Sequence, residues 1–345
     1  MNYRLLIALS SIAIAVPAQA QSLTEQFAPP RETLTEQLNR QPQTDEISVV
    51  LRSIADQNFQ YGREEAAVGR FDEAIAAWQQ AALDYEQLQD ASALGSVYEN
   101  LATLYTQLGR SLEAEDVLRR RLAIARDTED ELGQIFALNR LAAILLVRGN
   151  PGAAQILSLE ANRIAQQIGD PAGQGFALSN LGAISLQLGQ TEEAIKQLEV
   201  AIDFLRRTRE AAVAIRARNV LGDAYRTANQ PQDALRNYLI ALDLSESIDD
   251  RASQFRAIDG LIAVYSTLGQ PQTALDLLRD RLNLAQANSQ QQLNTARLLA
   301  EFFVQQGDRA QATLYFQAAI AIARYLEDRQ QEGLLVSRQA SLGLR

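Results

Sequence analysis

Apolar residues recur along this chain at the three- and four-residue spacing of amphipathic helices, from about residue 48 to about residue 328. This pattern breaks at two kinds of place, and each kind returns every forty residues. The first kind is a glycine or asparagine, at Gly69, Gly109, Gly149, Gly189, Asn229, Gly269 and, two residues early, Gly307. The second kind is acidic, at Asp90, Asp130, Asp170, Glu210 and Asp250. A period kept over about 240 residues indicates a stack of similar helical hairpins rather than one compact core.

Both breaks have the chemistry of helix ends. Glycine adopts the left-handed conformation that ends a helix, and a short carboxylate caps the free N–H groups at the start of the next one. Proline also stands at helix starts, where its missing N–H costs nothing, at Pro151, Pro171, Pro231 and Pro271. Each unit is therefore predicted as a helix A, a tight turn, a helix B and a capped entry into the next unit.

Side-chain columns distinguish this hairpin from other helical repeats of similar length. Helix A carries a large residue followed by a small one, at Leu101-Ala102, Leu141-Ala142, Leu181-Gly182 and Leu221-Gly222, and then an aromatic at Tyr105, Tyr225 and Tyr265. Helix B carries an alanine five residues after the glycine, at Ala74, Ala114, Ala154, Ala194, Ala234, Ala274 and Ala312. A large residue follows four positions later, at Trp78, Leu118, Leu198, Tyr238, Leu278 and Phe316.

With these columns the unit resembles the tetratricopeptide repeat in its long, forty-residue form, as in kinesin-light-chain-like arrays and bacterial scaffold proteins. The resemblance implies an all-α fold, a right-handed α-solenoid of about seven hairpins over residues 46–330. Residues 331–345 are expected to form a capping helix that covers the last apolar face. Three features depart from the family pattern: Tyr61-Gly62 replaces Leu-small, Ser158 replaces the large helix-B residue, and Arg121 and Arg281 replace a small one.

The first twenty residues have the composition of a secretory signal. Arg4 gives the start a positive charge, an apolar run spans Leu5–Val16, and Ala18-Gln19-Ala20 has the small-x-small pattern that signal peptidase cuts. We therefore expect a signal peptide over residues 1–20, cleavage after Ala20, no membrane span in the processed chain and a periplasmic or secreted location. Residues 21–45 are rich in Gln, Thr, Glu and Pro, and are expected to be a flexible leader.

Composition narrows the possible functions. The chain contains no cysteine and no histidine, which excludes thiol and imidazole catalysis as well as thiolate and imidazole metal sites. Its formal net charge of −10 opposes binding to nucleic acid. Carboxylates are plentiful but lie on predicted solvated helix faces. We expect a non-catalytic protein that needs no cofactor or metal.

Tetratricopeptide arrays usually bind extended peptides in a concave groove lined by helix A, and helical geometry indicates which side chains face it. The predicted groove residues are Asn100, Phe136, Asn139, Phe176, Asn180, Arg216, Asn219, Asp223, Arg226, Arg256 and Asp259. They are mainly apolar in the third and fourth repeats and charged from the fifth onward. A second interpretation remains open: the phenylalanines pack between helices, the asparagines bridge turns, and the arginines pair with Asp223 and Asp259.

The leading functional expectation is an extracytoplasmic scaffold that binds a peptide or protein segment in this groove. The alternative is a structural role, in which the array associates with itself or serves as a rigid spacer within an envelope complex.

Overall fold

In the computed structural model, residues 42–343 are described, so the predicted signal peptide and most of the predicted leader lie outside them. Seven helical hairpins follow one another, and the last is covered by one further helix. The A helices are α3 (Pro42–Ala67), α5 (Ala91–Gln107), α7 (Glu131–Val147), α9 (Pro171–Gln187), α11 (Ala211–Thr227), α13 (Arg251–Thr267) and α15 (Ser289–Gln305). The B helices are α4 (Phe71–Gln87), α6 (Ser111–Asp127), α8 (Pro151–Ile168), α10 (Thr191–Leu205), α12 (Pro231–Ser247), α14 (Pro271–Leu284), which a short 3-10 helix η1 (Ala285–Ala287) extends, and α16 (Arg309–Tyr325). The predicted α-solenoid is confirmed.

The turns have the predicted conformations. Every residue of the glycine column has a positive φ, including Asn229 at 57°. At the second turn, the carboxylates of Asp90, Asp130, Asp170 and Asp250 accept backbone N–H groups at the start of the following helix, whereas Glu210 makes no such cap. The residue before the cap is also left-handed in most copies, although only one of these is a glycine; the others include Gln89 and Glu129.

The core columns are buried as expected. All seven alanines of the helix-B column are 0% exposed, and the large residues four positions later are at most 3% exposed. Successive helices pack along the whole array, and the buried apolar residues form a series of clusters between the A and B helices. The final helix α17 (Arg329–Ser341) buries Leu335 in the cluster formed by α15 and α16, which confirms the capping helix.

The first repeat starts earlier than predicted. Helix α3 begins at Pro42, so residues 42–45 belong to the helix and not to the leader. Proline interrupts a helix when it stands in the interior, but it is tolerated in the first turn, where Pro42 lies. The unusual Tyr61-Gly62 pair keeps its small member for packing: a Cβ at Gly62 would lie 2.5 Å from the Trp78 ring, whereas Tyr61 is exposed.

The structure accommodates the other two departures from the repeat pattern in different ways. Ser158 is completely buried, and the neighbouring Leu157 packs against the core on both sides. Arg121 and Arg281 are also buried, at 6% and 3% exposed, in a column that is alanine elsewhere. Each guanidinium extends into a polar network between repeats, which compensates the cost of burying its charge.

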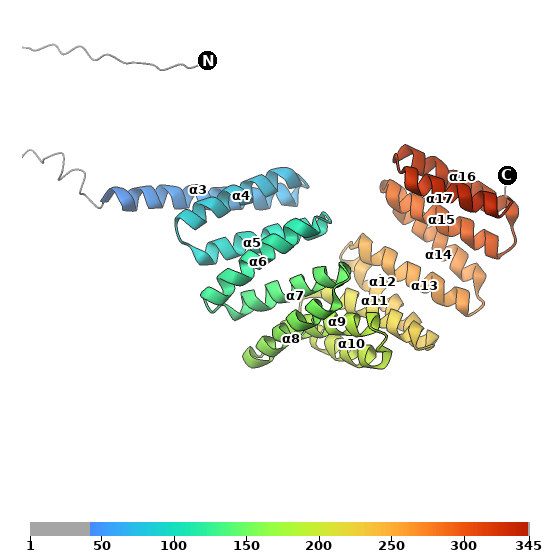
Figure 1. Ribbon diagram of the computed structural model, residues 1–345, viewed down its shortest axis with the longest axis horizontal. Coiled ribbons are helices and arrows are strands. Elements are labelled where there is room, and N and C mark those ends of the chain that lie inside the picture. Colours follow the sequence, from blue (N-terminus) through green and yellow to red (C-terminus); the bar gives the residue numbers. More distant parts are fainter. Residues whose placement is uncertain (1–41, 344–345) are drawn as a thin grey trace, which may run out of the picture.

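The hairpins together form an arc, with α8 and α10 at its outer edge (Figure 1). In repeats 3 to 6, the A helices α7, α9, α11 and α13 also contact one another directly, each with the next. This direct packing determines which side chains of helix A remain accessible.

Candidate functional site

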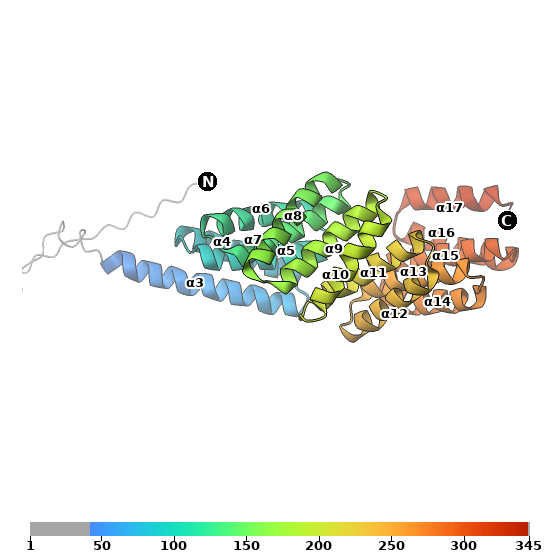
Figure 2. The same ribbon diagram turned by 90° about the horizontal axis from the view of Figure 1, so that it is seen from below.

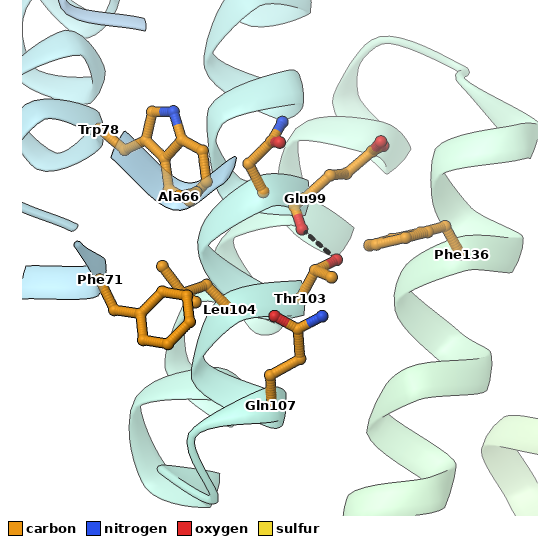
Figure 3. A pocket seen from close by; sticks show the side chains of 9 residues that line it. Ala66, Phe71, Trp78, Glu99, Thr103, Leu104, Gln107 and Phe136 are labelled. Carbon is orange, nitrogen blue, oxygen red and sulfur yellow. Dashed lines mark hydrogen bonds between the residues drawn. The ribbon is translucent and has the colours of Figure 1, made fainter. Parts of the chain in front are cut away.

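The A helices α3, α5 and α7, together with the B helix α4, border a hollow of about 410 Å³ (Figure 3). Its wall on α5 is polar, with Glu99, Asn100, Thr103 and Gln107, and Phe136 of α7 closes one side. The rest is mainly apolar, with Ala66, Phe71, Trp78 and Leu104. Two predicted groove residues from different repeats, Asn100 and Phe136, therefore come together at one site.

Some of the polar groups in the hollow already form hydrogen bonds within the protein. The amide nitrogen of Asn100 donates to the carbonyl of Ser96 at 2.8 Å, and the Thr103 hydroxyl donates to the carbonyl of Glu99 at 2.8 Å. The amide oxygen of Asn100 accepts no hydrogen bond from any residue of the described region, 42–343. One acceptor thus remains for a ligand that offers an N–H group.

The other three predicted asparagines lie elsewhere than expected. Asn139, Asn180 and Asn219 are 0%, 4% and 2% exposed. The Asn180 amide donates to the carbonyl of Asn139 at 2.8 Å, and Asn139 and Asn219 point toward carbonyls of the next helix A at 3.4 and 3.5 Å. Because the A helices of these repeats pack directly on one another, this column is inside the interface between them. These amides join repeats and are not accessible to a ligand.

The two phenylalanines each carry an arginine. The guanidinium of Arg140 lies over the Phe136 ring, 4.5 Å from its centroid, and that of Arg216 lies over Phe176 at 5.2 Å. Both rings also pack partly against the core. The interpretation of the phenylalanines as groove residues and the interpretation as packing between helices are therefore compatible. Arg140 was missed in the sequence; its signal is its place one helical turn after Phe136, which puts both on one face.

Neither arginine has a carboxylate partner among the residues that the structure describes. Within residues 46–343, Arg140 and Arg216 form no ion pair, and the buried Nε of Arg140 has no hydrogen-bond acceptor. Desolvation lowers the pKa of both guanidinium groups, and the charge of Arg216 lowers the pKa of Arg140 further. Arg216 nevertheless retains access to water. Arg216 thus contacts water and is still surrounded by protein, as expected for a side chain on a concave surface.

Charges from distant helices act on Arg140. Glu99 of α5 and Glu210, at the start of α11, both raise its pKa and partly offset the desolvation.

The charged residues predicted from repeat 5 onward are mostly paired within the protein. The Asp223 carboxylate accepts the Tyr238 hydroxyl at 2.7 Å, forms an ion pair with Arg256, and lies 4.0 Å from Arg226. Asp259 accepts two bonds from the buried Arg281, at 2.6 and 3.2 Å. The interpretation of these side chains as internal pairs therefore describes Asp223, Arg226, Arg256 and Asp259, while Arg216 is the exception.

In the part of the chain from residue 42 to residue 343, no helix has the length and apolar character required to cross a membrane. The same residues contain no cluster of carboxylates arranged to hold a metal ion.

Comparison with known families gives three matches. Residues 93–132 and 134–207 match two families described as tetratricopeptide repeat. Residues 224–297 and 272–338 match the family described as anaphase-promoting complex subunit 5. Among curated proteins, none matches this sequence significantly.

Several solved structures share the fold at low sequence identity. The apo form of RapI is 15% identical, with a TM-score of 0.58 over 79% of this chain and 99% of its own. A tetratricopeptide repeat protein from Parabacteroides merdae is 15% identical, with a TM-score of 0.53 over 82% of this chain and 99% of its own. A Rap protein complexed with competence and sporulation factor is 12% identical, with a TM-score of 0.54 over 86% of this chain and 98% of its own. Together, the repeat columns, the hairpin stack and these matches show that the chain is a tetratricopeptide repeat protein.

Proposed function

We propose that this protein is a non-catalytic scaffold that binds an extended peptide or protein segment along the A-helix side of repeats 1 to 5. The observation that carries the proposal is the pair of guanidinium groups of Arg140 and Arg216, which stack on Phe136 and Phe176 and have no carboxylate partner within residues 46–343. A charged group that is partly desolvated and unpaired is costly to maintain, and a bound anion would relieve that cost.

The hollow next to these arginines supports an extended ligand. It offers an apolar wall for a side chain and the free amide oxygen of Asn100 for a peptide N–H. The expected ligand segment therefore has an apolar part, placed between α3 and α7, followed by an acidic part at Arg140 and Arg216. A single neutral hydrogen bond contributes only about 0.5–1.5 kcal/mol, so useful affinity requires several repeats to act together.

Two further observations agree with this role. Helical repeat arrays of this kind present extended binding surfaces. One structural neighbour, a Rap protein, is complexed with competence and sporulation factor, which supports the idea that this architecture accommodates a factor from outside its own chain.

The proposed location is extracytoplasmic. It is supported by the positively charged start, the apolar run Leu5–Val16 and the Ala18-Gln19-Ala20 motif. Mass spectrometry of the protein isolated from its source would test this proposal, because cleavage predicts a chain that begins at Gln21. An intact chain beginning at Met1 would contradict it.

Binding can be tested with an array of synthetic peptides of about twelve residues, in which acidic and apolar content vary independently. We expect bound peptides to contain both aspartate or glutamate and a large apolar residue. The double variant Arg140→Glu and Arg216→Glu should lose this selection. The matched control is Arg236→Glu on helix B of the fifth repeat, where the arginine is exposed and pairs with Asp233 at 3.4 Å. Equal binding by all three proteins would refute the assignment.

A further inference from the structure

The outer face of the first helix carries an uncovered apolar stripe. Ile47, Ile54 and Tyr61 follow one another at seven-residue spacing along α3 and are 63%, 45% and 48% exposed. Val50 lies on the same face and is 58% exposed. A seven-residue repeat of apolar side chains on one helix face is the pattern of a seam that packs against another helix.

The same columns are buried where a preceding repeat exists. Forty residues later, the counterparts of Ile54 and Tyr61 are Leu94 and Leu101, which are 9% and 2% exposed and lie in the core cluster to which the preceding helix α4 contributes. Among the described residues, α3 has no preceding B helix to cover it. The stripe is thus a packing face that lacks its partner, at the end of the array opposite to the one that α17 covers.

Two positions on this side of α3, one between Ile54 and Tyr61 and one after Tyr61, are polar. Gln57 and Glu64 occupy the columns in which the second repeat has Val97 and Leu104, which are 0% and 3% exposed. Polar residues there keep the stripe from being a fully apolar surface. This composition fits a contact that forms and separates, and not a permanently buried core.

The length of α3 indicates what covers it. Helix α5 begins at Ala91, whose counterpart is Leu51, yet α3 begins at Pro42, nine residues before that point. The helix therefore continues through the place where other repeats turn back, and Figure 2 shows its start running out beyond the hairpins. The partner must accompany a long, straight helix.

The stripe from Ile47 to Tyr61 extends about 21 Å along α3 and starts five residues after Pro42.

A second copy of α3 has the same length and carries the same seam, whose residues Ile47, Ile54 and Tyr61 are evenly spaced. Ile47 and Tyr61 are each seven residues from Ile54. We propose that two copies of this protein associate through their α3 helices, antiparallel around a two-fold axis near Ile54. In this arrangement Ile54 packs on its own counterpart, and Ile47 packs on the Tyr61 of the other copy, as an isologous interface requires. This inference is independent of the proposed peptide-binding role.

Sedimentation equilibrium of the processed chain, Gln21–Arg345, tests the proposal between about 5 and about 300 µM. A seam of three layers is small, so we expect a monomer–dimer equilibrium with a dissociation constant on the order of tens of micromolar. Ile54→Glu should shift it to monomer throughout, because the two glutamates would face each other at the axis. The control Val147→Glu, at a position that is 86% exposed on α7, should leave it unchanged. Helical circular dichroism would verify that both variants fold.

Cross-linking locates the interface, since the chain contains no cysteine of its own. Oxidation of Ile54→Cys should yield a covalent dimer, and oxidation of Val147→Cys should not. A monomer at every concentration, or equal cross-linking at both positions, would overturn the proposal. It would also be overturned if the chain became dimeric only after deletion of residues 21–41, because those residues would then be the segment that covers α3.

Discussion

The guanidinium of Arg121 occupies the space that a side chain at Gly133 would need. A Cβ at Gly133 would lie 2.0 Å from Nη2 of Arg121, a distance that real atoms do not tolerate. The arginine is held in place by Glu99 at 2.7 Å and Asp130 at 2.5 Å, so it cannot simply move aside. Helix B of the second repeat and helix A of the third are thus joined through a glycine and a buried ion-pair network.

Gly133→Ala is therefore expected to destabilise the protein by about 1–3 kcal/mol, through overpacking and displacement of the buried guanidinium. The matched control is Gly152→Ala, near the start of the next helix, where a Cβ would have no neighbour within 4 Å. There the substitution should stabilise by up to about 1 kcal/mol, because alanine favours a helix more than glycine does. Urea denaturation of both variants gives the two changes; equal effects would contradict this account of Gly133.

Removal of the partner of the second buried arginine should be costly. Asp259→Ala leaves Arg281, 3% exposed, without its carboxylate, and should cost about 3 kcal/mol. Arg281→Ala restores the alanine that other repeats have in this column. We expect the double variant to be more stable than Asp259→Ala alone. A double-mutant cycle measures the coupling, and additive losses would show that the two side chains do not depend on each other.

Two asparagines predicted for the same task should behave differently. Asn180→Ala removes a buried amide that donates to the Asn139 carbonyl, and should cost about 1–2 kcal/mol of unfolding free energy. Asn100→Ala should change stability by less than about 0.5 kcal/mol, because its amide nitrogen bonds only within its own helix. The same peptide array should show weaker binding for Asn100→Ala. Normal binding by that variant would place the ligand away from the hollow.

Stability should change little with pH between about 5.5 and 9, because no histidine or cysteine titrates there. Below this range it should fall. A backbone N–H bond from Ala93 lowers the pKa of Asp90; burial alone would raise the pKa of Asp130, but the Gly133 N–H and Arg121 outweigh it and lower that pKa. Because both carboxyl groups have a lowered pKa in the folded protein, their contribution is present above about pH 4 and lost as the pH falls through the folded values.

Above about pH 10 stability should fall again. Burial, assisted by nearby carboxylates, raises the pKa of Tyr85 and Tyr238 in the folded protein. The unfolded chain therefore releases these phenolic protons at a lower pH than the folded protein does, and the free energy of unfolding falls once the pH exceeds the pKa of the unfolded chain. Thermal melts followed by circular dichroism across the full pH range would check both limits. A transition between pH 6 and 8 would contradict the assignment of the titrating groups.

Most of the fold was predictable because its determinants are local and repeated. The turn glycines, the Asp caps and the alanine column each depend on a short stretch of backbone or on one contact with the adjacent helix, and each occurs several times. The start of α3 was not predictable in the same way. Pro42 is compatible with both a break and a first helical turn, and no earlier copy of the repeat was present for comparison.

The candidate site was less predictable than the fold. Helical spacing placed Asn100, Asn139 and Asn180 on the same face of their helices, yet only Asn100 lines the hollow. Spacing within one helix does not tell how closely the next helix A approaches. It also did not reveal that Arg140 and Arg216 would lose access to carboxylates while Arg256 would reach Asp223.

The amino-acid sequence by itself determined the period, the order of helices, the turns and the buried columns, because each repeats an interaction that extends no further than the neighbouring hairpin. Only the tertiary structure decided which side chains of helix A remain open. The arc packs the A helices together in repeats 3 to 6 and separates α5 from α7, so identical positions become interface in one repeat and surface in another. The exposed stripe on α3 has the same origin: Ile54 and Tyr61 belong to core columns, and no preceding helix among residues 42–343 covers them.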